Sequence, residues 1–423
     1  MVEYIRHQLS NGLVVLVHRD PLTPMVVTNV VYNAGSKFDP PHMTGMAHLL
    51  EHLMFGGSKN APNFDTPQQL AGGENNAYTN ADITNYFQVL PGKNLEVALW
   101  LESDRMSFLN LDQKTFDIQK AVVLEEYNET CLNEPYGDVW HYIHHLAYKN
   151  YPYKWPTIGL TPEHIAGIGL DEVKRFYKSR YRPENAVLSI AGNVDEDKAL
   201  KAVEKWFGDL KSEGESSVNL GTEPKQMEIR RKEILSMVPH PAVYMAFHIP
   251  DKVNQRFPTI DLLSDLLGLG RSCRLNEILV EEKEIFSAVD AYVNGANDMG
   301  LFIIEGKLNE GFSSKQGEQA IWEVLEEVKK EKVMPSEIEK LQNTFATAHA
   351  FSCTSSLHKA MNLAHYENLG DANLFNTEIE EYMRVHEEDL KREAKTIFRP
   401  NNASIVTYEP AKLKRVNHKF HPL

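Results

Sequence analysis

Two similar hexapeptides, one in each half of the chain, constrain its fold more than any other feature. The first is Tyr181-Arg182-Pro183-Glu184-Asn185-Ala186 and the second is Phe398-Arg399-Pro400-Asn401-Asn402-Ala403. Each follows a charged amphipathic helical pattern and precedes a β-branched strand pattern. A chance match would not carry these flanks, so the sequence indicates an internal duplication. We therefore expect an α+β protein of two homologous α/β domains, each with a mostly antiparallel sheet packed with helices.

A small, polar, turn-rich segment lies between the two halves. It follows Lys211 and contains serine, glycine and proline in a run that favours neither helix nor strand. We predict an N-terminal domain over residues 1–211, a linker over 212–224 and a C-terminal domain over 225–423. A chain of 423 residues is long enough for at least two such domains.

The first half begins with strand patterns. Ser10-Asn11-Gly12 predicts a hairpin turn, and residues 26–32 are rich in β-branched side chains. Gly72-Gly73 predicts a turn, followed by a strand that runs to Val89. Helical patterns cover 93–108, 113–130, 136–147 and 171–180, before a strand over 186–191.

The five residues His48-Leu49-Leu50-Glu51-His52 are the strongest functional signal. Positions i, i+3 and i+4 share one face of an α-helix, so the two imidazoles and the carboxylate converge. Neutral imidazole is the usual zinc ligand, and a nearby unbound Glu can accept a proton from the attacking water. This order is an inverted zinc-protease motif, so we expect a zinc hydrolase.

A solvated helix face with two histidines would look similar, and the chain contains 17 of them. The flanking residues argue against this alternative, because they are almost all apolar and predict a buried helix. Burying two His and a Glu without partners is unfavourable, and a metal supplies such a partner. The flanking apolar residues are Met46, Ala47, Leu49, Leu50, Leu53, Met54 and Phe55.

Catalytic zinc needs a third protein ligand, since water takes the fourth position. The best candidate segment is the helical stretch from Gln119 to Glu129, which has an apolar stripe and several acids. Helical spacing allows Glu125, Glu126 or Glu129 and does not choose among them.

The composition and charge of the chain exclude some classes of function. A net charge of −15 disfavours nucleic-acid binding, because no basic surplus neutralises phosphates. The three cysteines are widely spaced, which is typical of free thiols in a reducing compartment. The first residues lack the charged start and apolar core of a signal peptide, and no window reaches the roughly 18 apolar residues of a membrane span. We expect a cytoplasmic protein.

With these motifs the chain resembles the pitrilysin/insulinase family of zinc peptidases, in its short branch that includes the mitochondrial processing peptidase. The resemblance covers nearly the whole chain. It rests on Gly45–Phe55, Asn76-Ala77-Tyr78-Thr79, Val123-Leu124-Glu125-Glu126, Ile158-Gly159 and the two Arg-Pro-x-Asn segments.

The resemblance implies a complete catalytic site. The family's third ligand is the Glu that closes the hydrophobic run, which implies one Zn²⁺ per chain on His48, His52 and Glu126. Glu51 would then be the general base and proton donor of an endopeptidase. The resemblance also implies that a peptide substrate adds as a strand along residues 76–79.

Two departures from the family pattern matter. The family usually has a second Glu seven residues before the ligand, where this chain has Gln119, whose amide can hold a hydrogen bond but brings no charge to the ligands. Active single-chain relatives also carry an Arg, and a Tyr seven positions later, that grip the substrate. An ungapped match places Val280 and Ser287 there, with Phe286 and Tyr292 nearby.

The missing clamp implies that this chain is the catalytic half of a two-chain enzyme. We expect a heterodimer with a homologous chain that has the Arg/Tyr clamp but no zinc, with a homodimer as the alternative. The two chains would enclose a chamber for peptides or unfolded segments.

Other functions are compatible with parts of the sequence. A non-catalytic assembly subunit of the same family is the alternative, although such subunits typically lose the zinc residues that are present here. A structural zinc normally has four ligands and no adjacent free carboxylate, so Glu51 argues against one. The histidines within 140–145 suggest a second metal site, but no carboxylate is in register, so we expect an exposed helix face there.

Overall fold

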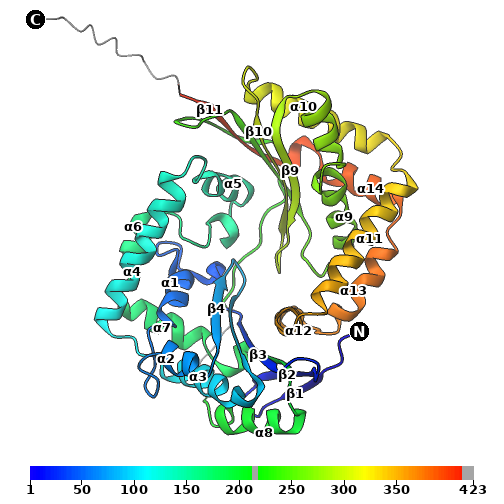
Figure 1. Cartoon of the computed structure of the whole chain (residues 1–423). Helices are drawn as coiled ribbons and strands as arrows, with labels where there is room; N and C mark the ends of the chain where they lie inside the picture. Colours follow the sequence, from blue (N-terminus) through cyan, green and yellow to red (C-terminus); the bar gives the residue numbers. More distant parts are fainter. Residues whose placement is uncertain (212–217, 412–423) are drawn as a thin grey trace, which may run out of the picture.

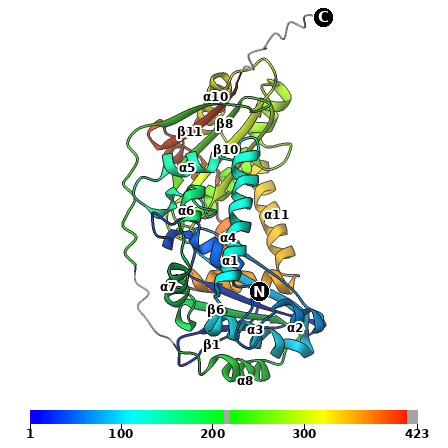
Figure 2. The ribbon, with the colours of Figure 1, turned by 90° about the vertical axis from the view of Figure 1, so that its left-hand side faces the viewer.

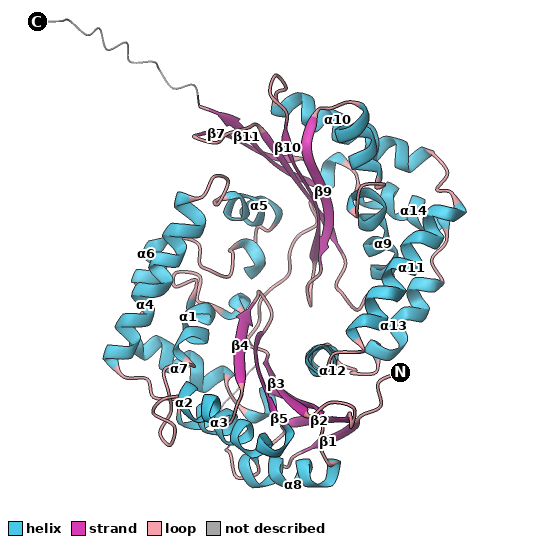
Figure 3. Cartoon of the chain, viewed as in Figure 1, coloured by secondary structure: helices cyan, strands magenta, loops and turns pink. Residues whose placement is uncertain are grey.

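The computed structural model describes residues 1–211 and 218–411, which form two sheets surrounded by helices (Figure 1; Figure 3). Within these residues the first sheet has six strands in the order β1-β2-β6-β3-β5-β4. Only the β2–β6 pair is parallel. The strands are β1 (Ile5–Gln8), β2 (Val14–Arg19), β3 (Met25–Tyr32), β4 (Glu74–Thr79), β5 (Thr84–Pro91) and β6 (Ala186–Gly192).

The second sheet repeats this topology. Its five strands within the described residues have the order β7-β11-β8-β10-β9, and only the β7–β11 pair is parallel. Strand by strand this matches β2-β6-β3-β5-β4 of the first sheet, so the expected α+β duplication is confirmed. The strands are β7 (Arg230–Ser236), β8 (Ala242–Ile249), β9 (Phe286–Asn294), β10 (Gly300–Leu308) and β11 (Ala403–Pro410).

Helices accompany the strands in both halves, with α1–α8 in the first and α9–α14 in the second of the described halves. Those of the first half are α1 (Met46–Leu53), α2 (Asp65–Leu70), α3 (Leu95–Phe108), α4 (Gln113–Tyr127), α5 (Val139–Ala147), α6 (Pro162–Ala166), α7 (Leu170–Arg180) and α8 (Glu196–Phe207). Those of the second half are α9 (Phe257–Gly268), α10 (Ser314–Lys330), α11 (Pro335–Ser352), α12 (Ser356–Asn368), α13 (Leu374–Met383) and α14 (Glu387–Ile397).

The repeated hexapeptides close the same junction in both halves. The side-chain amide of Asn185 donates to the carbonyls of Arg180, at the end of α7, and Asn33, just after β3. Asn402 donates in the same way to Ile397, at the end of α14, and His248 on β8. One Asn thus ties the end of a helix to the neighbouring strand, because its amide satisfies carbonyls that the helix leaves unpaired.

Each half lends one helix to the sheet of the other half. α5 packs on β8 and β11 of the second sheet, where Ile143 and Ala147 join a cluster with Tyr244 and Tyr408. α12 packs on β2, β3 and β6 of the first sheet, where Leu363 is fully buried. Figure 1 shows α12 between the two sheets. This exchange covers one face of each sheet and joins the halves.

A buried charge cluster also joins the halves, at the turn between β9 and β10. Nζ of Lys37 lies 2.7 Å from Oδ1 of Asp82 and 3.2 Å from Oδ2 of Asp298. The hydroxyl of Tyr153 donates to Asp82, and that of Tyr151 donates to Asp298. Lys37 and Asp82 are buried, so their charges are compensated by each other and by these donors.

Two local expectations meet different outcomes. The hairpin at residues 10–12 is confirmed, since β1 and β2 pair antiparallel around it. The single strand expected to run to Val89 is wrong, because a turn at residues 80–83 separates β4 from β5. Oδ1 of Asn80 accepts the N–H groups of Asp82 and Ile83, and this local contact reverses the chain.

The chain between the halves is described only in part. Residues 212–217 of the predicted 212–224 linker lie outside the described residues, as do 412–423. Figure 2 shows the described residues that follow 217 passing along one side of the molecule toward β7. None of the helices in the described ranges has the length and apolar character that a bilayer span requires.

Candidate metal centre

Two features hold the N-terminal turn of α1, the helix that carries the motif. Gly45 precedes it with φ of 92°, a left-handed conformation that favours glycine. The carboxylate of Asp39 accepts the N–H groups of Gly45 and Ala47, at 2.8 and 2.9 Å. These N–H groups would otherwise lack a partner in the first turn. The apolar side of α1 is buried in the first core, which leaves His48, Glu51 and His52 only partly covered.

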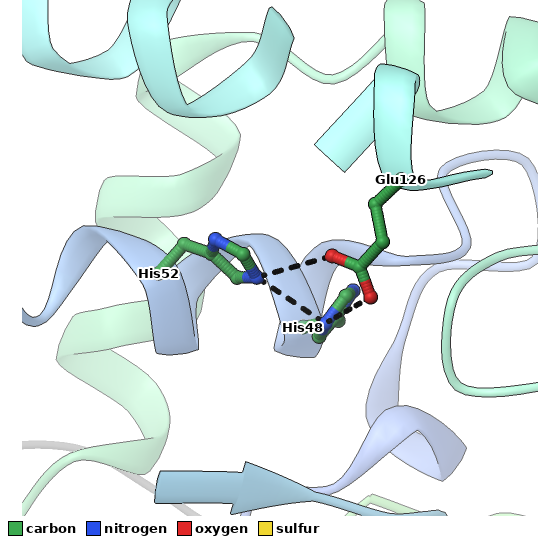
Figure 4. Close-up of side chains that lie close together, drawn as sticks. All are labelled: His48, His52 and Glu126. Carbon is green, nitrogen blue, oxygen red and sulfur yellow. Dashed lines mark hydrogen bonds and ion pairs between the residues drawn. The ribbon is translucent and has the colours of Figure 1, made fainter. Parts of the chain in front are cut away.

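The structure brings His48, His52 and Glu126 together (Figure 4). Nε2 of His48 lies 3.3 Å from Nε2 of His52. The Glu126 carboxylate, near the end of α4, lies 3.7 Å from Nε2 of His48 and 3.5 Å from Nε2 of His52. Within the described residues this is the only group of three such side chains close enough to share a metal ion. Glu125 and Glu129, the other two candidates from spacing, are not part of it.

These distances fit a tetrahedral zinc site. Zinc binds imidazole nitrogen and carboxylate oxygen at roughly 2.0–2.2 Å, so neighbouring ligand atoms of a tetrahedron lie roughly 3.3–3.6 Å apart. Two nitrogens and one oxygen are also a catalytic donor set, since three protein ligands leave one position for water. The residues present therefore fit the ion.

The protonation states of two of these three groups favour metal binding. Burial lowers the pKa of His48 to about 4, so its imidazole is neutral at neutral pH. A hydrogen bond with His52 lowers the pKa of Glu126, which keeps the carboxylate ionised. The same bond raises the pKa of His52, and a metal would compete with that proton.

Glu51 is half-buried on the same helix and contacts the edge strand. Its Oε2 accepts a hydrogen bond from the Thr79 hydroxyl at the end of β4. Burial raises the pKa of Glu51 above its ordinary value, with the Thr79 bond acting in the opposite direction. A carboxylate with a raised pKa is a stronger base, which suits proton transfer.

Strand β4 carries the four residues expected to bind substrate. Within the described residues it pairs with β5 on one side only, so its other edge is open. Asn76 and Tyr78 are exposed, whereas Ala77 and Thr79 are half-buried. The Ala77 N–H donates to Oδ1 of its neighbour Asn76 at 2.8 Å. Figure 1 shows β4 beside α1, so this edge runs along the candidate centre.

The two departures from the family pattern are visible in the structure. Gln119 lies beside the centre on α4, where its side-chain hydrogen bond contributes to the raised pKa of His52. Val280 lies in a helical turn (Asn276–Glu282) and packs against the second core. Ser287 is exposed on β9 and donates to the Lys307 carbonyl. Tyr292 donates to Glu305 on the adjacent strand.

The second half has different chemistry at the corresponding helix. α9 follows β8 as α1 follows β3, and it carries Asp261 and Asp265 at the same i, i+4 spacing as the two histidines. Burial raises the pKa of Asp265 to about 7. Oδ2 of Asp261 accepts the Tyr382 hydroxyl at 2.7 Å. Among residues 1–211 and 218–411, the candidate centre therefore lies in the first half only.

One sequence expectation near the centre is wrong, and one residue that holds α1 was not expected. The expected exposed face at residues 140–145 is wrong for His141 and His144, which are half-buried and bonded to the carbonyls of Gly159 and Tyr153. Asp39 was not a candidate, because its partners become visible only in three dimensions. The N-terminal position of the helix and an acid a few residues before it are the only signals that could have indicated it.

The two-domain fold is that of a known peptidase family, as comparison with protein-family models shows. The insulinase (peptidase family M16) model matches residues 14–160, and the peptidase M16 inactive-domain model matches 167–345. The chain belongs to the pitrilysin/insulinase family of peptidases.

Individual relatives share most of the chain. Zinc protease PqqE of Helicobacter pylori is 29% identical over 408 residues, covering 95% of this chain and 92% of the relative. The crystal structure of a protease from Helicobacter pylori superposes with a TM-score of 0.92 at 28% identity, covering 97% of this chain and all of that one. The mitochondrial-processing peptidase subunit beta of Saccharomyces cerevisiae is 28% identical over 218 residues, covering 51% of this chain and 46% of the relative.

Proposed function

We propose that this chain is a zinc-dependent endopeptidase that cleaves peptides or unfolded polypeptide segments. The observation that carries the proposal is the convergence of His48, His52 and Glu126 at distances that suit one zinc ion. The relatives named zinc proteases support the same metal. An assembly subunit would have no need to keep this donor set beside a free carboxylate.

The three ligands would hold the ion, and Glu51 would handle the proton. A bound Zn²⁺ would polarise the scissile carbonyl and acidify the attacking water. Glu51 takes the proton of that water and delivers it to the leaving amine. Thr79 holds the carboxylate of Glu51 in place through its hydroxyl.

The open edge of β4 would align the substrate. An extended peptide that adds to β4 would receive main-chain hydrogen bonds from Asn76 to Thr79, in the manner of β-strand addition. A substrate carbonyl would replace the local bond between the Ala77 N–H and the Asn76 side chain. Main-chain recognition would make the enzyme selective for extended segments rather than for one sequence.

A homologous partner chain would complete the site. Val280 cannot supply the charge of the clamp Arg, and Ser287 lacks the aromatic ring and the reach of the clamp Tyr. The similarity to a subunit of the mitochondrial processing peptidase supports a two-chain enzyme. The partner would have the clamp and lack zinc, and the two chains would enclose the peptide.

Peptide cleavage by matched variants tests this proposal. We expect Glu51→Gln to lower the cleavage rate by roughly 10²- to 10⁴-fold, because the amide cannot accept the proton, while zinc content stays unchanged. Undiminished cleavage by Glu51→Gln would refute the role of Glu51. Adding the candidate partner should raise the activity of the wild-type chain, whereas full activity of the chain alone would refute the two-chain model.

A further inference from the structure

A thiol, an imidazole and a carboxylate lie close together in the second half of the chain, away from the candidate metal centre. Cys353 caps the C-terminal end of α11, and its Sγ lies 3.7 Å from Nε2 of His349, one turn earlier. Nδ1 of the same ring lies 3.3 Å from Oε1 of Glu378 on α13. Thiol, imidazole and carboxylate therefore stand in sequence, as in sites where an imidazole takes the proton of a nucleophile and an acid orients the ring.

The surroundings hold the imidazole and the carboxylate in this position. The His349 ring lies between Phe345 and Phe375, with centroids 6.2 and 5.2 Å away. The side chain of His349 is 13% exposed. The second oxygen of Glu378 accepts the hydroxyl of Tyr366. Burial raises the pKa of Glu378, and Lys252 is the other charged group that acts on it.

Cys353 is one of the residues that line a cavity between the two halves of the chain. Cys353 lines a cavity of about 600 Å³, a volume in the range of small-molecule sites. The first half contributes residues of the first sheet to the lining of this cavity, and the second half contributes the turn between α11 and α12. Charges of both signs are present, with Lys359 paired to Asp20 at 2.8 Å. The lining residues include Asp20, Met25, Glu74, Val89, Cys353 and Lys359.

The other two cysteines have no such setting. Cys131 and Cys273 are buried, and burial raises the pKa of both thiols. Metal binding at Cys353 is not supported, since the search for three convergent ligands within the described residues finds only the centre in the first half. The cluster is therefore best explained by the reactivity of the thiol.

We propose that Cys353 is a reversible modification site that reacts with small, zwitterionic peptide disulfides such as oxidised glutathione. His349 accepts the thiol proton, and the Cys353 sulfur attacks one sulfur of the disulfide. The new S–S bond forms as the old one breaks, and the leaving thiolate takes the proton from His349. The Cys353 sulfur is oxidised, the departing sulfur is reduced, and excess thiol reverses the exchange.

The adduct would lie against both halves at once. The cavity lies where the start of α12 meets the first sheet, and α12 is one of the two exchanged helices. A peptide disulfide there would contact Asp20 and Lys359, whose ion pair joins the halves. The modification would therefore act at the junction of the halves.

Peptide mass mapping after treatment with oxidised glutathione tests this site in the full chain. We expect Cys353 to be modified faster in the folded chain than in the urea-unfolded chain, while Cys131 and Cys273 react only after unfolding. Modification of Cys353 that is no faster in the folded chain would overturn the proposal, and this comparison needs no variant.

Two matched histidine variants test the role of the imidazole. We expect His349→Gln to slow the modification of Cys353 on the order of ten-fold, because the thiol loses its base. The control is His358→Gln, an exposed histidine on α12, which should leave the rate unchanged. Equal rates in wild-type, His349→Gln and His358→Gln chains would show that exposure alone governs the reaction and would overturn the proposal.

Discussion

Asp39 is a single buried residue that holds the first turn of α1, the helix that carries His48 and His52. Its carboxylate is fully buried, yet it accepts two N–H groups from the first turn of the motif helix. Burial raises its pKa from 3.8 to about 8. At a pH between about 4 and about 8, Asp39 therefore keeps its proton in the folded chain and has released it in the unfolded chain.

This difference predicts that stability falls as pH rises through that window. The slope can reach roughly 1.4 kcal/mol per pH unit, since the unfolded state binds fewer protons than the folded state. Asp39→Asn should flatten the slope, because an amide does not titrate. Denaturant unfolding of both chains between about pH 5 and about pH 8 measures this. An identical slope in the two chains would show that Asp39 does not carry the effect.

Single residues also show where sequence reasoning about the site stops. The spacing of His48, Glu51 and His52 was sufficient to place them on one helix face, because i, i+3 and i+4 are local relations. Spacing could not choose Glu126 over Glu125 or Glu129, since the choice depends on which side of α4 faces α1. The bond between Thr79 and Glu51 was equally hidden, because it joins two elements.

At the level of elements, the exchange of α5 and α12 was not visible in the sequence. The repeat of strands and helices was visible in the sequence, because the hexapeptides mark equivalent positions in two similar patterns. An amphipathic stripe shows that a helix face is buried but not which sheet buries it. The turn between β4 and β5 was missed for a related reason: the apolar pattern continues through it, and Asn80 reverses the chain locally.

Because α12 packs on the first sheet, one core substitution in this helix should strongly lower the free energy of unfolding. Leu363 is fully buried among residues of the first sheet, so Leu363→Ala removes contacts between the halves. We expect the free energy of unfolding to fall by roughly 2–5 kcal/mol. Leu70→Ala is the control, because Leu70 is 85% exposed and its loss should change stability by less than about 0.5 kcal/mol. Equal effects of the two substitutions in denaturant unfolding would contradict this account of α12.

On the scale of the whole molecule, the ion pairs of Lys37 with Asp82 and Asp298 join the two halves beside strand β4. Asp82 lies in the turn that follows β4, and Asp298 lies in the corresponding turn before β10 of the second half. The same contacts that hold the halves together therefore hold the end of β4.

Breaking this cluster should destabilise the junction. Lys37→Met leaves the buried Asp82 carboxylate without its cation, and we expect a loss of roughly 3–5 kcal/mol. Lys205→Met is the matched control, because its pair with Glu96 is more than half exposed and should contribute no more than about 1 kcal/mol. Thermal and denaturant unfolding of both variants checks the difference. A loss below that of Lys205→Met would mean that the cluster does not stabilise the junction.

The claim on which the whole account depends is that one zinc ion binds between α1 and α4. Elemental analysis of purified chains, at equal protein concentration, tests it most directly. We predict about one zinc per chain for the wild type and for Glu51→Gln, and a loss of most of this zinc in His48→Ala, His52→Ala and Glu126→Ala. Undiminished zinc in the three ligand variants, or a wild-type chain that binds none when zinc is supplied, would contradict the account.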